Sequence, residues 1–217
     1  MLVKNPIISG LNPLPQIYII TGTDGSGKDT IIRQLRTNNP KLHFAVTHTD
    51  RTPRPNEANG IDYHFVSTIQ FQNMIDNDEF IEHALIYGYH KGVSRGEITL
   101  AMQSGSDVLL RINIDGAISV KKHFPSAVSI FVTTESKEIL HQRLKTRNSD
   151  SEEEIQKRLD DFERIYSLID SCDYIVINKE NELTESVKNV ESIMLSSKLK
   201  VNYNIPSQYH HIMKLTP

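Results

Sequence analysis

Short apolar runs alternate along the chain with longer segments whose apolar residues recur at helical spacing. Five of the runs have the length and composition of buried strands, at residues 17–20, 43–47, 107–112, 128–132 and 174–177. Strands that alternate with helices in this way form parallel sheets with right-handed crossovers. The pattern therefore predicts an α/β fold with a five-stranded parallel sheet flanked by helices.

Helix starts are marked by serines with an acidic or amide residue three positions later, the pattern of a capping box. Three such pairs precede periodic segments: Ser67 with Gln70, Ser94 with Glu97, and Ser151 with Glu154. The last pair opens a charged helix that we expect to continue to about residue 170. A polar stretch at 148–151 separates it from another charged helix. Such a hinge is typical of a mobile lid, which we place at about 144–158.

The segment between the second and third predicted strands has strand patterns of its own. Residues 62–66 alternate as a half-buried strand does, and residues 80–85 form another strand-like run. We expect a small antiparallel flap here, inserted over about residues 48–94. The chain then divides into an irregular lead-in at 1–15, a domain at 16–199 and a tail without periodicity at 200–217.

Composition narrows the function classes. With 217 residues, 38% of them hydrophobic, the chain can bury one sizeable core. A net charge of -3 argues against binding nucleic acid by a basic surface, and the single cysteine, Cys172, excludes an intramolecular disulfide. The N-terminus lacks a secretory signal, and no run approaches the roughly 20 apolar residues of a membrane span. We therefore expect a soluble cytoplasmic monomer or homodimer without nucleic-acid or membrane partners.

A glycine-rich stretch follows the first predicted strand and leads into the first helix. Its three glycines allow a tight turn whose N–H groups point inward, the helix dipole adds positive potential, and a lysine supplies a point charge. This strand, loop and helix order predicts a P-loop for a nucleoside triphosphate. The alternative is a glycine-rich turn that binds nothing. We expect ATP to be bound by Gly22, Thr23, Asp24, Gly25, Ser26, Gly27, Lys28, Asp29 and Thr30.

One position departs from the P-loop pattern. The residue after Lys28 is Asp29, where the pattern has a Ser or Thr whose hydroxyl binds magnesium, and Thr30 comes one place later. A carboxylate is also a good magnesium ligand, directly or through water. We therefore expect Asp29 to bind a magnesium ion together with the ATP phosphates.

A polar segment punctuated by prolines carries Arg51 and Arg54, and Tyr63 follows shortly after. Arginine forks bind phosphate in a bidentate manner. Two arginines and a tyrosine on a flap outside the triphosphate loop are suited to hold the phosphate of a second substrate. A solvated charged loop is the alternative.

The chain resembles the guanylate kinase family through these residues. Segments 47–57 and 60–66 match most of the family's flap signature, and the resemblance covers about residues 16–195. It implies a P-loop kinase fold with a nucleotide-binding flap and a helical lid. It also implies that ATP, with magnesium, phosphorylates a nucleoside monophosphate, GMP above all, so that the partners are small-molecule substrates.

The resemblance assigns roles to individual positions. The catalytic residues would be Lys28, Arg143, Arg147 and Arg158, and Asn178 would join the ATP site. The acceptor nucleotide would be bound by Thr47, Arg51, Arg54, Glu57, Tyr63, Glu82, Lys91 and Asn113.

Several positions depart from the family and mark a divergent member. Arg111 and Asn113 replace two aspartates, and Lys91 replaces a phosphate-binding tyrosine. We expect Arg111 to pair with Asp29 or Asp115. Two further hypotheses stay open. The ribose 1,5-bisphosphate phosphokinases of phosphonate metabolism share the Gly-Lys-Asp of the loop, and a binding module that has lost catalysis would keep the fold.

Overall fold

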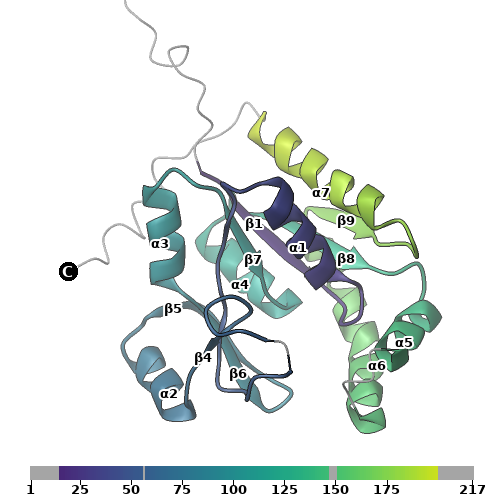
Figure 1. The fold of residues 1–217 in the computed structure, drawn as a ribbon, viewed down its shortest axis with the longest axis horizontal. Helices are drawn as coiled ribbons and strands as arrows, with labels where there is room; N and C mark the ends of the chain where they lie inside the picture. The colour runs from purple at the N-terminus through teal and green to yellow at the C-terminus, as the bar shows by residue number, and fades with distance from the viewer. Residues whose placement is uncertain (1–14, 56, 147–150, 200–217) are drawn as a thin grey trace, which may run out of the picture.

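Five parallel strands form the central sheet of the structure, a computed structural model that describes residues 15–55, 57–146 and 151–199. The strand order is β2-β7-β1-β8-β9. The strands are β1 (Ile17–Gly22), β2 (His43–Phe44), β7 (Val108–Arg111), β8 (Val128–Thr133) and β9 (Tyr174–Ile177). The predicted five-stranded parallel sheet is confirmed (Figure 1).

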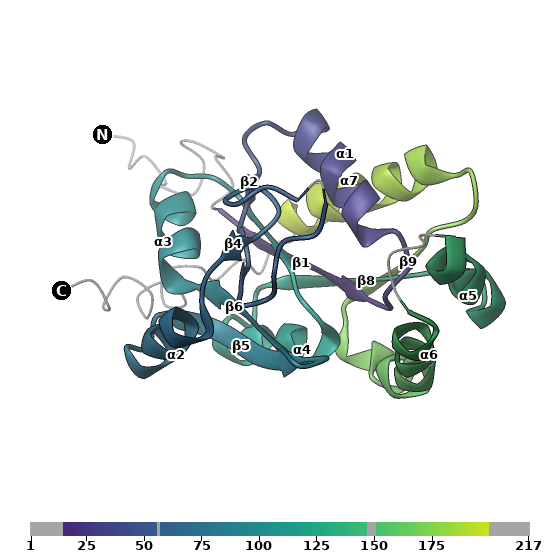
Figure 2. The same ribbon diagram turned by 60° about the horizontal axis from the view of Figure 1, so that its bottom comes forward.

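Helices cover both faces of this sheet (Figure 2). On one face lie α1 (Lys28–Asn38) and α7 (Leu183–Lys198), and on the other lie α3 (Arg95–Gln103) and α4 (Ile114–His123). Two more helices, α5 (Lys137–Thr146) and α6 (Glu152–Ser167), pack together beside the carboxyl end of β8, and a short 3₁₀ turn (Ile169–Ser171) follows α6.

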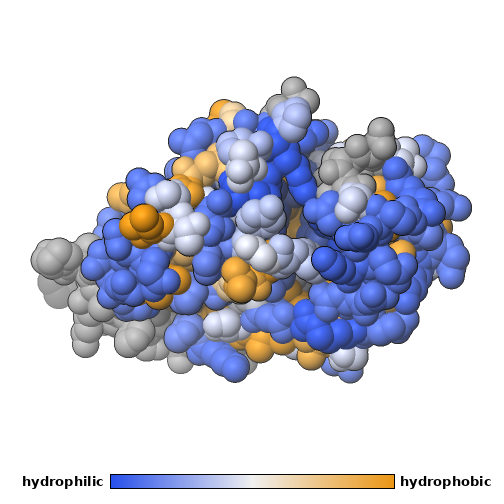
Figure 3. Space-filling model, turned by 90° about the horizontal axis from the view of Figure 1, so that it is seen from below, coloured by the Kyte–Doolittle hydropathy of each residue, from blue (hydrophilic) through white to orange (hydrophobic). Residues whose placement is uncertain are grey.

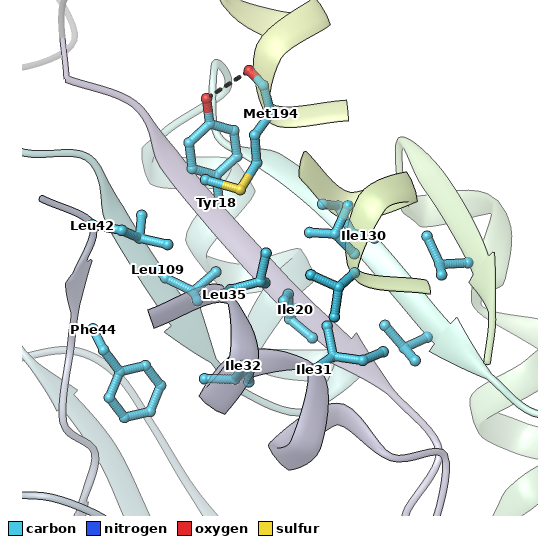
Figure 4. Close-up of a cluster of buried hydrophobic side chains, with 14 of the residues drawn as sticks. Tyr18, Ile20, Ile31, Ile32, Leu35, Leu42, Phe44, Leu109, Ile130 and Met194 are labelled. Atoms are coloured by element: carbon cyan, nitrogen blue, oxygen red, sulfur yellow. Dashed lines mark hydrogen bonds between the residues drawn. The ribbon is translucent and has the colours of Figure 1, made fainter. Parts of the chain in front are cut away.

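The central strand β1 is buried over its whole length because it has helices on both faces. Ile20 packs among Ile31 and Leu35 of α1 (Figure 4). Tyr18 is fully buried on the same face, and its hydroxyl donates a hydrogen bond of 3.0 Å to the carbonyl of Met194 in α7. The bond satisfies a polar group that would be costly to bury alone. The core thereby fixes where the loop after β1 emerges.

A second, four-stranded sheet forms most of the flap, in the order β4-β3-β6-β5. Its elements are β3 (His48–Thr49), β4 (His64–Phe65), β5 (Phe80–Ile86), β6 (Tyr89–Ser94) and the covering helix α2 (Thr68–Asp76). Two predictions were wrong in part. The strand predicted over 43–47 is present only at His43–Phe44, and the chain joins the flap sheet as β3 just after the predicted range. The flap sheet is mixed and not purely antiparallel, because β3 pairs with β4 in parallel.

A bulge in β5 controls which way its side chains point. Phe80 pairs with Ser94 and Glu82 pairs with the next residue, Val93, so Ile81 is an extra residue without a partner on β6. All three consecutive residues of β5 are buried. The bulge lets Ile81 enter the main core, whereas Glu82 lines a cleft on the opposite side of the flap from Phe80.

The capping boxes predicted at the starts of α2 and α6 are both complete. Ser94 caps α3 by accepting the N–H of Glu97, but the Glu97 carboxylate binds His43 and His64 instead of closing a box. The charged helix α6 ends at Ser167, short of the expected 170. The structure also contains α4 and β6, which the sequence patterns did not predict. Among the described helices, none has the length and apolar character required to cross a membrane.

We expect the Gly22→Ala variant to unfold at a much lower urea concentration than the wild-type protein. Gly22 has a φ of 129°, and a Cβ there would lie 2.0 Å from the carbonyl oxygen of Val132. Such a clash between backbone atoms should lower the free energy of unfolding by roughly 3 kcal/mol, measured by urea denaturation.

Gly96→Ala is the matched control. A Cβ at this position in α3 meets nothing within 4 Å, and alanine favours the helix by about 0.5 to 1 kcal/mol. Equal effects of the two substitutions would contradict the packing described for β1.

Candidate active site

A cleft of about 460 Å³ opens where β1 and β7 end. In open α/β sheets this edge is where ligands bind. Figure 3 shows that the face around it is mostly hydrophilic, with a recess between the flap side on the left and the α5–α6 side on the right. The predicted site residues that line the cleft are Gly22, Asp24, Gly25, Gly27, Lys28, Asp29, Thr30, Thr47, Tyr63, Glu82, Lys91, Asn113 and Arg143.

The loop after β1 has the backbone that a phosphate site requires. Gly25 and Gly27 have φ values of 85° and 89°, which favour glycine. Helix α1 begins at Lys28, and its N-cap Gly27 has no side chain that could cap it, so the positive end of the helix faces the cleft. The Lys28 ammonium group donates to the carbonyls of Gly22 (2.9 Å) and Thr23 (2.6 Å). Burial lowers the pKa of Lys28, although nearby acids oppose the shift.

Asn178 lies behind this loop, not in the cleft. Its side-chain amide donates to the Ser26 carbonyl at 2.8 Å and accepts from the Ser186 hydroxyl at 2.9 Å. A Cβ at Gly27 would come within 2.2 Å of its Nδ2 atom, so the glycine is required for this close approach. The Thr23 and Ser26 hydroxyls are buried, with no hydrogen-bond partner among the described residues.

Two acids beside the lysine each hold an arginine from another element. Asp24 binds Arg158 of α6 at 2.5 Å, and Asp29 binds Arg111 at the end of β7 at 2.8 Å. The second pair confirms one of the two partners expected for Arg111. Burial would raise the pKa of Asp24, but the positive charges of Lys28 and Arg158 outweigh it and lower the pKa.

Asp29 is suited to bind a divalent metal ion with a phosphate ligand. It stands in the first turn of α1, its side chain is 44% exposed, and it lines the cleft. Within the described ranges, no three His, Cys, Asp or Glu side chains are grouped to hold a metal by themselves. Magnesium commonly takes one or two carboxylates and completes its shell with phosphate and water.

The flap arginines Arg51 and Arg54 are not among the described residues that line the cleft. The Arg51 Nη2 atom donates to both carboxylate oxygens of Glu57, each at 2.8 Å, and its guanidinium carbon lies 5.5 Å from the centre of the Tyr63 ring. The Arg54 backbone N–H donates to the same carboxylate at 2.7 Å. Glu57 therefore fixes the direction of Arg51, and Tyr63 lies between that arginine and the cleft.

Glu82 is a buried acid of the cleft whose pKa is shifted by its surroundings. It is 8% exposed, and its carboxyl group lies against α4, where a Cβ on Gly116 would come within 2.8 Å of it. Burial, and then the charge of Asp115, raise the pKa of Glu82 to about 7. The nearby Thr47 hydroxyl is buried and has no hydrogen-bond partner in the described part of the chain.

Asn113 lines the same end of the cleft and begins α4. Its side-chain oxygen accepts the Gly116 N–H at 3.0 Å, as an N-cap does. The oxygen that we expected to bind the acceptor is therefore used by the helix. The start of α4 was not predicted from the sequence, because the residue three positions after Asn113 is a glycine and not the Glu or Gln of a capping box.

The lid arginines approach the loop from α5 and α6. Arg143 donates to the Asn178 carbonyl at 3.0 Å and lines the cleft, and Arg158 reaches Asp24. Arg147, the third predicted lid arginine, falls outside the described residues.

Sequence reasoning missed the contact between the flap and α6. The Tyr87 hydroxyl donates to Asp161 of α6 at 3.4 Å, and Arg158 lies over the Tyr87 ring at 5.5 Å. Arg164 of α6 binds Asp115 at 3.1 Å, and it lines the cleft with Tyr87 and Asp161. Tyr87 lies in the turn between β5 and β6, where its φ is 50°. The Tyr87-Gly88 pair could have located this turn in the sequence, but not the contact with α6.

Comparisons with known proteins agree on one family. A family model described as guanylate kinase matches residues 15–197. Guanylate kinase from Desulfitobacterium hafniense is 38% identical over 85% of this chain and 92% of that protein. Guanylate kinase 2, chloroplastic/mitochondrial, from Oryza sativa is 38% identical over 88% of this chain and 67% of that protein. The crystal structure of guanylate kinase from Anaplasma phagocytophilum has a TM-score of 0.72 at 25% identity, covering 87% of this chain and 89% of its own.

We expect Asn113→Ala to lower the free energy of unfolding by about 1 kcal/mol, the usual effect of losing an N-cap. Asn113→Asp keeps a capping oxygen and should change it by only a few tenths. The measurement is urea denaturation at pH 6. At this pH Glu82 is mostly protonated, so its charge does not repel the new carboxylate of Asn113→Asp. A similar loss in both variants would show that Asn113 does not cap α4.

Proposed function

The chain belongs to the guanylate kinase family, and from this premise we propose that its cleft transfers the γ-phosphoryl group of ATP to GMP, giving ADP and GDP. The observation that carries the proposal is the cleft itself, where a P-loop with its lysine meets the buried carboxylate of Glu82. The first arrangement is suited to a triphosphate, and the second to a base that presents two N–H donors. We assign about residues 48–94 to the acceptor flap and about 144–158 to the lid.

On the donor side, the N–H groups of the loop and the start of α1 hold the ATP phosphates, and Lys28 approaches the outer ones. Arg143 and Arg158, with Arg147, neutralise the oxygens of the phosphoryl group during transfer. In phosphoryl transfer such charge stabilisation and positioning supply most of the catalysis.

Magnesium fits this site through Asp29, whose carboxylate lines the cleft in the first turn of α1. The ion would bind the ATP phosphates and withdraw charge from them. Thr30, which also lines the cleft, would assist through its hydroxyl.

On the acceptor side, Arg51, Arg54, Tyr63 and Lys91 hold the GMP phosphate, and Glu57 orients Arg51. Ionised Glu82 accepts hydrogen bonds from guanine N1–H and N2–H, and Thr47 contacts the base through its unpaired hydroxyl. Because the amide oxygen of Asn113 caps α4, we assign its amide nitrogen to the base as a donor.

The other hypotheses have no support from the comparisons. The relatives described above bear the name guanylate kinase, and none of the three is named for a sugar bisphosphate. The cleft also keeps Lys28 and Arg143, which a binding module without catalysis would not need.

The test is a transfer assay with ATP and GMP, dGMP, AMP, IMP and ribose 1,5-bisphosphate, with products separated by ion-exchange chromatography. We expect GDP from GMP, the deoxy form to be accepted, and much slower turnover of AMP, whose base presents an acceptor at N1. Turnover confined to the sugar bisphosphate would overturn the proposal.

Lys28→Ala is the matching variant, because it removes the cation inside the loop. We expect turnover to fall by at least a hundredfold and the circular dichroism spectrum to stay the same, since the charge is most needed in the transition state. Lys188→Ala, on the exposed surface of α7, should change neither. Unchanged turnover of Lys28→Ala would exclude the loop as the catalytic site.

The pKa of Glu82 predicts how GMP use depends on pH. With a pKa of about 7 in the free enzyme, Glu82 is protonated below that pH and then offers a donor where guanine also donates. We expect kcat/KM for GMP to fall about tenfold per pH unit below pH 7, because the free-enzyme pKa controls this parameter.

Glu82→Gln separates this effect from ionisation of the GMP phosphate, whose own pKa is near 6. The variant should have a lower kcat/KM at pH 8, by roughly ten- to a hundredfold, and should lose the inflection near pH 7. An inflection that persists in Glu82→Gln would assign it to another group.

A further inference from the structure

Arg111 occupies a position between the P-loop and the flap that the proposed function leaves unused. It is the last residue of β7 and pairs with Ile20 of β1. Side chains alternate along a strand, so Arg111 shares a face with Leu109, which packs in the core beneath α1. The Arg111 side chain lies at the edge of that core and contacts Asp29 in the first turn of α1.

The contacts of Arg111 span the two walls of the cleft. Its Nη1 atom binds Asp29 at 2.8 Å, and its Nη2 atom donates to the backbone carbonyl of Asp62 in the flap at 3.1 Å. Its guanidinium carbon lies 4.6 Å from the centre of the Tyr63 ring. The side chain is only 16% exposed. Burial opposes its charge, but Tyr63 and Asp29 outweigh burial and raise the pKa of Arg111.

Tyr63 has positive charge on several sides. The Lys91 ammonium lies 6.0 Å from its ring centre, and the Arg51 guanidinium lies 5.5 Å away. Arg51 is already held on both oxygens of Glu57. Lys91 and Arg111, in contrast, line the cleft. An anion bound beside Tyr63 would therefore meet these two cations inside the cleft.

We propose that Arg111 binds the phosphate of the acceptor nucleotide together with Lys91, and that Asp29 positions it for this role. The inference rests on the proposed function and adds a residue to its acceptor site. A guanidinium has five N–H donors, and the described contacts with Asp29 and Asp62 use two of them. The remaining donors can bind a phosphate without loss of the anchor on the flap.

The opposing interpretation is that Arg111 only braces the flap against α1. A brace supports every acceptor equally, whether or not it carries a phosphate. A phosphate ligand, in contrast, contributes to the binding of GMP and contributes nothing to the binding of guanosine. The difference between these two ligands therefore separates the two roles.

The experiment measures GMP and guanosine binding by isothermal titration calorimetry, and kcat/KM for GMP, in the full chain. We expect Arg111→Gln to weaken GMP binding by about ten- to a hundredfold, the size of one charge-assisted hydrogen bond. Guanosine binding should stay within about twofold of the wild type. Arg111→Lys keeps the charge without the fork, and should weaken GMP binding by roughly three- to tenfold.

Arg95→Gln is the matched control, because Arg95 makes a similar pair with Asp78 at 3.0 Å and does not line the cleft. It should leave both affinities unchanged. If Arg111→Gln does not fold, Arg111→Lys decides the question by the same comparison.

Equal loss of GMP and guanosine affinity, or no loss of either, would overturn the inference. So would a wild-type protein that binds GMP no better than guanosine. A wild type that forms no GDP, while its GMP affinity still depends on Arg111, would overturn the proposed function and support the phosphate site.

Discussion

The positive charges of Lys28, Arg111 and Arg158 are largely shielded from water and must be balanced, and much of the site follows from this requirement. Lys28 is buried in the loop and relies on two backbone carbonyls and nearby acids. Arg158 and Arg111 each lie on an acid of the same loop and helix. Unpaired buried charges cost several kcal/mol each, so these cations need anionic partners. Asp24 and Asp29 supply them.

The same ion pairs also determine how the parts of the molecule meet. Arg158 joins α6 to the loop, and Arg111 joins the loop to the flap through the Asp62 carbonyl. The Tyr87 hydroxyl joins the flap to α6 by donating a hydrogen bond to Asp161. The core beneath β1 sets where the loop stands, and the charge pairs then hold the flap and α6 around it.

The sequence predicts the local features well and the long-range ones poorly. The sheet, the P-loop and the starts of α2 and α6 follow from periodicity and motif spacing, and the family resemblance names many of the cleft residues. Periodicity does not predict that the strand ends at Phe44 or that β3 of the flap sheet begins at His48, because pairing partners far along the chain decide this. The bulge at Ile81 is likewise set by the pairing of β5 with β6. The cap made by Asn113 is local, but Gly116 three positions later gives no capping-box signal. The Asp29 partner of Arg111 was foreseen because the two changes of charge compensate each other.

The pair between Asp24 and Arg158 has a consequence for the time that products stay bound. If Arg158 turns toward a phosphate during transfer, the Asp24 carboxylate competes with that phosphate for the same guanidinium. The competitor is tethered, so its effective concentration does not fall when products accumulate. Such competition would shorten the residence of ADP and would weaken ATP binding through the same interaction. In enzymes whose cycle is limited by lid opening, such a built-in competitor favours turnover over affinity.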